Sequence, residues 1–362
     1  MKQNESTANR GDVTETPKMA NKLRNIGIGF LRVFLSILLG LITGVVLLLV
    51  FGYEPIPVMI ELVRSIVNSR VSLIDTVLQA IPILLISLGV CLSYHGKLWN
   101  IGGEGQFYIG AVTATTVALS FPDLSGWILL PVILIAGFVG GATWSCIAGA
   151  LRAYRNANET VVTLMLNSIA TFIVGFAVRV PLREVGSPVE QTARLSSTGQ
   201  LPRFAGSRIH IGLIVALVLV PVVHYFLFRT SAGYRIRMVG EKPEVSKAAG
   251  VPTRKVILMT FLISGGLAGL GGAVHVSGVT HRLLLGISNR FGSTAILVAL
   301  MARRNPLLAG VIAFVFTALT VGGEGIQVAF GIPSDFIQVF LGILLLFVLA
   351  ADEFLKRRWE IL

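Results

Sequence analysis

The sequence is poor in charge and in cysteine. Asp, Glu, Lys and Arg make up 13% of its 362 residues, whereas hydrophobic residues make up 54%. A soluble domain carries roughly 25% charged residues, so the charge here cannot cover a surface that faces water on all sides. Cys91 and Cys146 both lie in apolar runs, which argues against a disulfide framework. The composition excludes an ordinary soluble domain and favours a protein that is largely surrounded by lipid.

The chain also lacks the motifs of several enzyme classes. Its five histidines show no metal-binding spacing such as HExxH, and no Gly-x-Ser-x-Gly motif is present. A phosphate-binding loop of the form GxxxxGK[ST] is missing too, because Gly96-Lys97 has neither the upstream glycine nor the following hydroxyl residue. We therefore expect no catalytic residue, metal or cofactor in this chain. If the protein uses ATP, a partner must supply the ATP site.

Long, continuous apolar runs dominate what is present. A run of about twenty residues in a helix crosses a hydrocarbon core of ~30 Å, and only helices or closed barrels satisfy the backbone there. Since the runs do not alternate, we expect an all-α integral membrane protein of about ten transmembrane helices, with interrupted or re-entrant segments. The short run at 291–303 is expected to form such a broken element with its neighbour. The expected spans are 29–51, 73–94, 105–121, 126–150, 160–180, 209–228, 256–278, 291–303, 307–325 and 335–351.

The distribution of basic residues predicts the orientation. The connection 229–255 holds seven basic residues and two glutamates, whereas 181–208 on the opposite side holds four arginines and two glutamates. The formal charge of +12 therefore indicates orientation by the positive-inside rule and not nucleic-acid binding. With ten spans both termini face the cytoplasm. We expect a disordered tail at 1–28, a membrane domain at 29–351 and a second cytoplasmic tail at 352–362.

Glycine pairs four residues apart predict close helix packing. Gly137 and Gly141 form one such pair, and Gly265 and Gly269 form another. Small residues at this spacing let two helix backbones approach each other in a membrane. We expect both pairs to lie at helix contacts.

Residues 99–106, with the sequence WNIGGEGQ, are the strongest candidate for an interrupted span. Glycines are concentrated here, and Asn100, Glu104 and Gln106 lie where two apolar runs meet. Unwound backbone at membrane depth persists only when it is buried in protein or lines a wet cavity, and ionisable groups there are candidates for function. We therefore expect these three side chains to line the path of a solute, although a simple turn is the alternative. The similar sequence GGEGIQ at 322–327 predicts a second, weaker interruption.

Polar residues also occur inside the span at 160–180. Thr163 and Asn167 are four residues apart and share a helix face. They can line a pathway or hydrogen-bond a neighbouring helix. Asp75 and Gln79 repeat the pattern in the span at 73–94.

The basic connection at 229–255 contains a predicted short helix. Pro243 and Glu244 suit a first turn, and Gly250 and Pro252 suit the end. Such a helix can dock into a soluble partner, and the alternative is a solvated loop that only orients the protein.

Four segments together resemble a known family. Residues 98–106 (LWNIGGEGQ), 158–167 (NETVVTLMLN), 237–251 (RMVGEKPEVSKAAGV) and 295–303 (AILVALMAR) are similar, in this order, to motifs of permease subunits of ABC importers. The class is that of ribose and branched-chain amino acid transporters, and the similarity is greatest to its nucleoside-type branch. Ala302, Leu308 and Lys242 depart from the pattern, which bears on the substrate branch more than on the class.

This resemblance implies the other subunits of the transporter. It implies cytoplasmic ATP-binding subunits, a second permease subunit in a homo- or heterodimer, an extracytoplasmic substrate-binding protein and a small polar solute, with no enzyme activity in this chain. It places the protein in the plasma (inner) membrane and implies no nucleic-acid partner. The residues expected to couple to the ATPase are Arg237, Gly240, Glu241, Pro243, Ala248, Ala249 and Gly250.

The implied function is import of nucleosides or a related ribosyl compound, driven by ATP that a separate subunit hydrolyses. Permeases of the same class for a sugar, a flavin or a branched-chain amino acid are alternatives. A gradient-driven transporter and a membrane receptor or scaffold without transport are the alternatives outside the class.

Overall fold

The computed structural model describes residues 48–67 and 69–332, together with residues 38, 42–46, 336, 339, 342, 343 and 346. The chain divides into two compact units, one formed by its two ends, up to Pro55 and from Asp335, and the other by Ile56–Ser334. In the first unit the rings of Phe51 and Phe336 meet edge to face, with centroids 6.0 Å apart. The predicted tails at 1–28 and 352–362 lie outside the described residues, as do most of the predicted spans 29–51 and 335–351.

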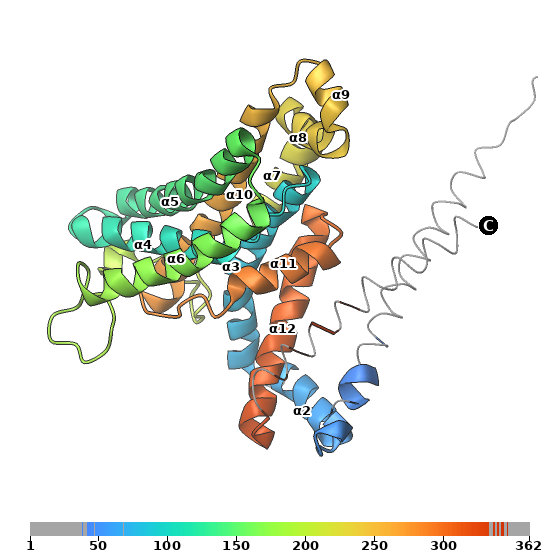
Figure 1. The fold of residues 1–362 in the computed structure, drawn as a ribbon. Coiled ribbons are helices and arrows are strands. Elements are labelled where there is room, and N and C mark those ends of the chain that lie inside the picture. The colour runs from blue at the N-terminus through green and yellow to red at the C-terminus, as the bar shows by residue number, and fades with distance from the viewer. Residues whose placement is uncertain are drawn as a thin grey trace, which may run out of the picture. The chain divides into compact units, whose positions relative to one another are not determined.

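The described part of the second unit is a bundle of helices without a named strand (Figure 1). Its elements are α2 (Pro55–Val67), α3 (Arg70–His95), α4 (Gly103–Ser120), α5 (Gly126–Arg155), α6 (Glu159–Arg179), the 3₁₀ turn η1 (Ser197–Gly199), α7 (Gly212–Arg229), α8 (Ser231–Glu241), α9 (Pro243–Ala248), α10 (Thr253–His275), the π-helical turn η2 (Val276–Thr280), α11 (Phe291–Met301) and α12 (Pro306–Phe330).

Six of the described helices are long and apolar enough to cross a membrane: α3, α5, α6, α7, α10 with η2, and α12. The predicted span at 105–121 is present as α4, but Glu104 and Gln106 in its first turn lower its hydropathy. The predicted span at 291–303 is present as α11, which has 11 residues and covers only about half of a ~30 Å core. The all-α membrane architecture is therefore confirmed.

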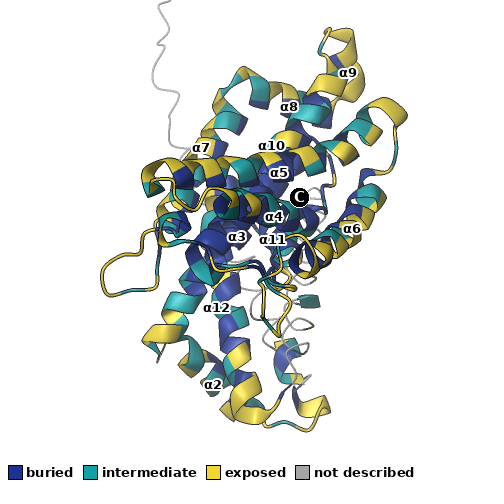
Figure 2. Ribbon diagram, turned by 90° about the vertical axis from the view of Figure 1, so that its left-hand side faces the viewer, coloured by how far each residue is buried: buried dark blue, intermediate teal, exposed yellow. Residues whose placement is uncertain are grey.

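Helix α3 lies at the centre of the bundle. In its most apolar stretch 89% of the residues are buried, whereas the figure for α7 is 28%. The most apolar stretches of the two helices have the same mean hydropathy, 2.1, so their neighbours and not their composition explain the difference. Helix α3 contacts α7, α8, α10, α11 and α12. Figure 2 shows this burial along α3 and the strong exposure of α9 at one end of the bundle.

The predicted glycine contacts are confirmed where α5 crosses α10. A methyl group added to Gly269 would lie 2.8 Å from the Cα of Gly141, and one added to Gly137 would lie 3.0 Å from the carbonyl oxygen of Gly269. Both distances are below ordinary van der Waals contact, so glycine alone permits this approach.

The predicted interruption at 322–327 is wrong. Helix α12 runs without a break from Pro306 to Phe330. A methyl group on Gly322 would lie 2.8 Å from the Ile66 side chain of α2, so this glycine makes room for a neighbouring helix and does not end its own.

Candidate functional site

The chain breaks between α3 and α4, at residues 96–102. Helix α3 ends at His95, and Lys97 adopts the left-handed conformation with φ 51°, which turns the chain. Residues 96–102 therefore connect two separate helices, upstream of the predicted interruption at 99–106, and the alternative of a turn fits this connection equally well. Gly103 and Gly105 are helical residues of α4, and of the three glycines only Gly102 precedes the helix.

Asn100 and Gln106 form a reciprocal amide pair inside this break. The Asn100 Nδ2 donates to Gln106 Oε1 (3.2 Å), and the Gln106 Nε2 donates to Asn100 Oδ1 (2.8 Å). Asn100 Nδ2 also donates to Ser264 Oγ of α10 (2.9 Å), and Gly102 N donates to Asn100 Oδ1 (3.0 Å). Asn100 is 1% exposed and Gln106 2%, so both side chains are enclosed in the bundle.

Asn167 of α6 holds the other side of the break. Its Nδ2 donates to the Ile101 carbonyl oxygen (3.0 Å), and its Oδ1 accepts from the Gly105 N–H (2.8 Å), one of the first-turn donors of α4. Thr163, one turn earlier on α6, is fully buried and donates to its own helix at the Glu159 carbonyl oxygen (2.7 Å). We call Asn100, Gln106, Asn167 and Ser264 the break network, because together they satisfy the polar groups that the interruption exposes.

Glu104 lies apart from this network and faces α11. Its carboxylate accepts a hydrogen bond from the Ser288 hydroxyl and another from the Gly292 N–H, the latter at 2.7 Å. Gly292 is the second residue of α11, so the carboxylate lies at the positive end of that helix, where negative charge is stabilising. The structure therefore places four of the five predicted pathway residues near the break between α3 and α4. The fifth, Glu104, faces α11 instead.

Helices α8 and α9 lie at one end of the bundle (Figure 1), and α9 is the short helix that was predicted in the basic connection. Pro243 is the first residue of α9, and Gly250 follows the helix with φ 72°, which confirms the predicted start and stop. Helix α8 was not predicted, and it begins where Thr230 Oγ1 accepts from the Gly233 N–H (3.1 Å).

The predicted coupling residues fall into two sets. Glu241, Pro243 and the Ala248–Gly250 segment are exposed on α9 and its edges. Arg237 is half-buried, with its guanidinium 5.2 Å from the centre of the Phe228 ring. Gly240 is buried against the end of α3, and a methyl group there would lie 2.7 Å from the carbonyl carbon of Gly96.

At the opposite end, the connection after α6 packs on the segment that follows η2. Leu195 N donates to the His281 carbonyl oxygen (2.8 Å), and Arg203 Nη2 donates to His281 Nε2 (2.6 Å). Since arginine only donates, the neutral ring carries its proton on Nδ1, which faces the Ser277 carbonyl oxygen (3.1 Å). Burial, and then the charge of Arg203, lower the pKa of His281, and burial lowers the pKa of His210 to about 4.

Sequence reasoning missed three partners of the predicted residues. Ser264, Ser288 and Gly292 contact Asn100 or Glu104 across 164 to 188 residues of chain. No motif or spacing signals these contacts, because each partner is a small residue in an ordinary apolar or turn context.

Several curated proteins resemble this chain along most of its length. A glucose ABC transporter permease of Haloferax volcanii is 30% identical over 334 residues, which cover 89% of this chain and 87% of that protein. A nucleoside ABC transporter permease of Lactococcus lactis subsp. cremoris is 28% identical, covering 91% and 92%. A guanosine ABC transporter permease of Bacillus subtilis is 30% identical, covering 87% and 91%. No solved structure resembles the chain closely enough to count as a match.

A family model described as the permease component of branched-chain amino acid transport systems matches residues 72–349. The matched range contains the break network, Glu104 and the α8–α9 segment. The similarity to nucleoside and guanosine permeases confirms the predicted resemblance to the nucleoside-type branch. The chain is a multi-pass membrane transport subunit, and it belongs to the family of branched-chain amino acid transport system permease components.

Proposed function

We propose that this permease imports nucleosides or a related ribosyl compound, with ATP hydrolysed by a separate subunit. The observation that carries the coupling part of the proposal is the contact of α8 with the end of α3, because it joins the exposed α8–α9 segment to the most buried of the six described membrane-crossing candidates. The similarity to nucleoside and guanosine permeases supports the solute. A force applied to α8 and α9 from the cytoplasm would reach α3 directly. ATP binding in the partner would then bias the bundle between two states.

The proposed route of coupling continues through the break. The chain leaves α3 at Gly96 and enters the break network, which contacts α4, α6 and α10. Glu104 then connects α4 to the start of α11. This route is defined by contacts in space. Energetic coupling along it is measured by the effect of mutations on transport. We propose Arg237 and Gly240 as the inner part of the coupling element and Glu241, Pro243, Ala248, Ala249 and Gly250 as its docking face.

Among the five predicted pathway residues, we propose Glu104 for direct contact with the solute. Its carboxylate is only partly buried and has acceptor capacity beyond the two hydrogen bonds described. Asn100, Gln106, Thr163 and Asn167 are buried or engaged with backbone and amide groups. We propose that these four act on the pathway by fixing the shape of the break.

The proposed topology has ten spans, with both termini and the α8–α9 segment in the cytoplasm of a plasma (inner) membrane protein. It comprises a tail at 1–28, a permease domain at 29–351 with a coupling loop at about 229–255, and a tail at 352–362. Support comes from the seven basic residues in that loop, since cytoplasmic connections are enriched in Lys and Arg.

We propose that the permease works as one half of a heterodimer, with ATP-binding subunits and an extracytoplasmic substrate-binding protein. Two different permeases of each of three organisms resemble this chain: TsgB13 and TsgC13 of H. volcanii, NupB and NupC of L. lactis, and NupP and NupQ of B. subtilis. Such pairs are what a permease of two unlike subunits would require.

Uptake by reconstituted vesicles tests both the energy source and the solute. The full chain is reconstituted with its ATP-binding subunit, second permease and binding protein, and entry of labelled guanosine or uridine is measured. Entry should stop when ATP is depleted and persist when an uncoupler is added at constant ATP. Collapse with the uncoupler would instead indicate a gradient-driven transporter.

Glucose is the second candidate solute, because the H. volcanii relative is a glucose permease. Excess unlabelled glucose should leave guanosine uptake unchanged, and excess uridine should compete with it. ATP-dependent entry of labelled glucose without any entry of labelled guanosine or uridine would exclude the nucleoside proposal while leaving the ATP-driven mechanism in place.

A further inference from the structure

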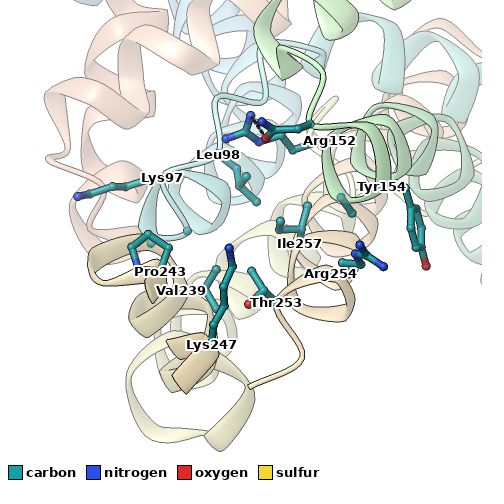
Figure 3. Close-up of a pocket in the computed structure, with 14 residues that line it drawn as sticks. Lys97, Leu98, Arg152, Tyr154, Val239, Pro243, Lys247, Thr253, Arg254 and Ile257 are labelled. Atoms are coloured by element: carbon teal, nitrogen blue, oxygen red, sulfur yellow. Dashed lines mark hydrogen bonds between the residues drawn. The ribbon is translucent and has the colours of Figure 1, made fainter. Parts of the chain in front are cut away.

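A cavity of about 560 Å³ opens at the end of the bundle that carries α8 and α9 (Figure 3). Four segments line it: the start of the break after α3, the last turn of α5 with the residue that follows it, the α8–α9 segment and the first turns of α10. Binding sites for small molecules enclose roughly 300–1,000 Å³. The cavity is therefore large enough for a ligand of many atoms.

Charge of one sign surrounds this space. Lys97, Arg152, Lys247 and Arg254 line the cavity, and the lining residues that the structure describes include no carboxylate. Only Arg152 has an acidic partner, Glu159 at 3.3 Å. Within the described part of the chain, Lys97, Lys247 and Arg254 form no ion pair. Like charges around a recess raise its positive potential and attract anions.

Two of these cations approach the cavity from opposite sides. Figure 3 shows the exposed side chain of Lys247 of α9 extending between Val239 and Thr253 toward the cavity, with Arg152 across from it. Lys97 points outward, and Arg254 turns toward Tyr154, its guanidinium carbon 5.6 Å from the ring centre. Lys247 and Arg152 therefore supply the inner donors, and the other two supply charge at the rim.

The start of α10 adds a third source of positive potential. Thr253 is the first residue of this 23-residue helix, it lines the cavity, and the preceding Pro252 makes no side-chain capping hydrogen bond. The first-turn N–H groups of a helix and its dipole favour a bound anion.

We propose that this cavity binds a phosphate-bearing anion, held by Lys247, Arg152 and the first turn of α10. A phosphate group carries up to two charges and three acceptor oxygens, which suits several converging donors. A single carboxylate of a protein partner would neutralise one cation only. The phosphate can belong to free inorganic phosphate or to the headgroup of an anionic phospholipid, since basic pockets at the cytoplasmic ends of membrane helices bind such headgroups.

Binding to the purified full-length permease distinguishes the two sources. In the first arm, inorganic phosphate is added in increasing concentration to the protein in nanodiscs of phosphatidylcholine, and the midpoint temperature of thermal unfolding is measured. In the second arm, phosphatidylglycerol is added to the nanodisc, and retained lipid is counted by native mass spectrometry. A ligand that binds the folded state raises its thermal midpoint, so at least one arm should respond.

The discriminating variants are Lys247→Gln and Lys255→Gln. Both remove one positive charge, but Lys255 is an exposed neighbour of Arg254 that does not line the cavity. Lys247→Gln should weaken binding by roughly tenfold, the change expected for one lost charge-assisted hydrogen bond. Lys247→Arg should restore it, which separates loss of the donor from damage to α9.

Three results would overturn the proposal. One is equal weakening by Lys247→Gln and Lys255→Gln, which would indicate general attraction to a basic surface. Another is the lack of any response to phosphate or phosphatidylglycerol in the unaltered protein. The third is an effect of Lys247→Gln on affinity for the ATP-binding subunit alone, which would assign the cavity to an acidic segment of that partner. Neither binding experiment requires transport. The proposed transport function can therefore fail while the proposal of a phosphate-binding cavity still stands.

Discussion

Gly240 of α8 lies directly against Gly96, the residue that follows the last turn of α3. The absence of a side chain at Gly240 permits this approach, because an added methyl group would lie 2.9 Å from the Gly96 Cα. The two residues join the exposed α8–α9 segment to the helix that is most deeply buried among the six membrane-crossing candidates. Helix α8 also contacts α7 and α10, so the proposed route predicts that α3 moves together with these two helices when a partner moves α8.

Replacing Asn167 with alanine should destabilise the protein by about 1–3 kcal/mol, because it leaves the buried Gly105 N–H without its acceptor and the Ile101 carbonyl without its donor. Thermal unfolding in detergent measures the change. Thr171→Val, one turn further along α6, removes an exposed hydroxyl that bonds only within its own helix and serves as the control. Equal stability of the two variants would show that the break does not depend on Asn167.

Glu104→Gln separates a structural role from contact with the solute. Loss of the charge at the start of α11 should cost only about 0.3–1 kcal/mol of stability. If Glu104 also contacts the solute, the KM for uptake should rise by roughly tenfold, as for one lost charged hydrogen bond. Ser288→Ala removes a donor to the same carboxylate but keeps its charge, so it should leave KM nearly unchanged. A fall in stability without any change in KM would remove Glu104 from the pathway.

Acid should loosen the segment that joins the connection after α6 to the residues after η2. The pKa values of His210 and His281 are lowered in the folded protein, so protons bind the unfolded state first as pH falls below about 6.5. The stability that these neutral rings contribute is therefore present at neutral pH and is lost toward pH 4. The protection factors of the Leu195 and Leu201 amides, which correct for the slower intrinsic exchange at lower pH, should fall over this range, since both amides donate to carbonyls of the 277–281 segment.

His281→Gln provides the check on that assignment. An amide can still accept from Arg203 but does not titrate in this range. The protection factor of the Leu195 amide should therefore depend less on pH in the variant. The same pH profile in the variant and the unaltered protein would place the responsible group elsewhere.

Local signals in the sequence were sufficient for the helical architecture and for α9, because Pro243 and Gly250 mark its ends through backbone chemistry alone. The same local signals did not reveal whether a glycine ends a helix or lies inside one. Gly102 precedes α4, whereas Gly322 lies inside α12 and makes room for Ile66, and both stand in nearly the same sequence. A glycine that ends a helix and one that admits a neighbour differ only in tertiary context.

The polar residues show the same limit. The sequence predicted that Asn100 and Gln106 matter at the break, but their enclosure depends on Ser264 of a distant helix. Thr163 and Asn167 had two possible roles. The hydrogen bonds of Asn167 to the Ile101 and Gly105 backbone favour the second, contact with a neighbouring segment, whereas those of Thr163 stay within its own helix and do not distinguish the two. Burial of a polar side chain follows from which helices pack together, and one sequence does not specify that.

The most direct test of the account is the coupling ratio of Gly240→Leu, measured as solute imported per ATP hydrolysed in reconstituted vesicles. The larger side chain must push α8 away from Gly96, so hydrolysis should continue while the ratio falls by roughly tenfold or more, as a displacement of about 1 Å in a positioned element can cost that much. Gly175→Ala, on a face of α6 where the nearest atom would be 3.6 Å from the added methyl group, should keep the ratio unchanged. A normal ratio in Gly240→Leu would contradict the claim that α8 drives the bundle through α3.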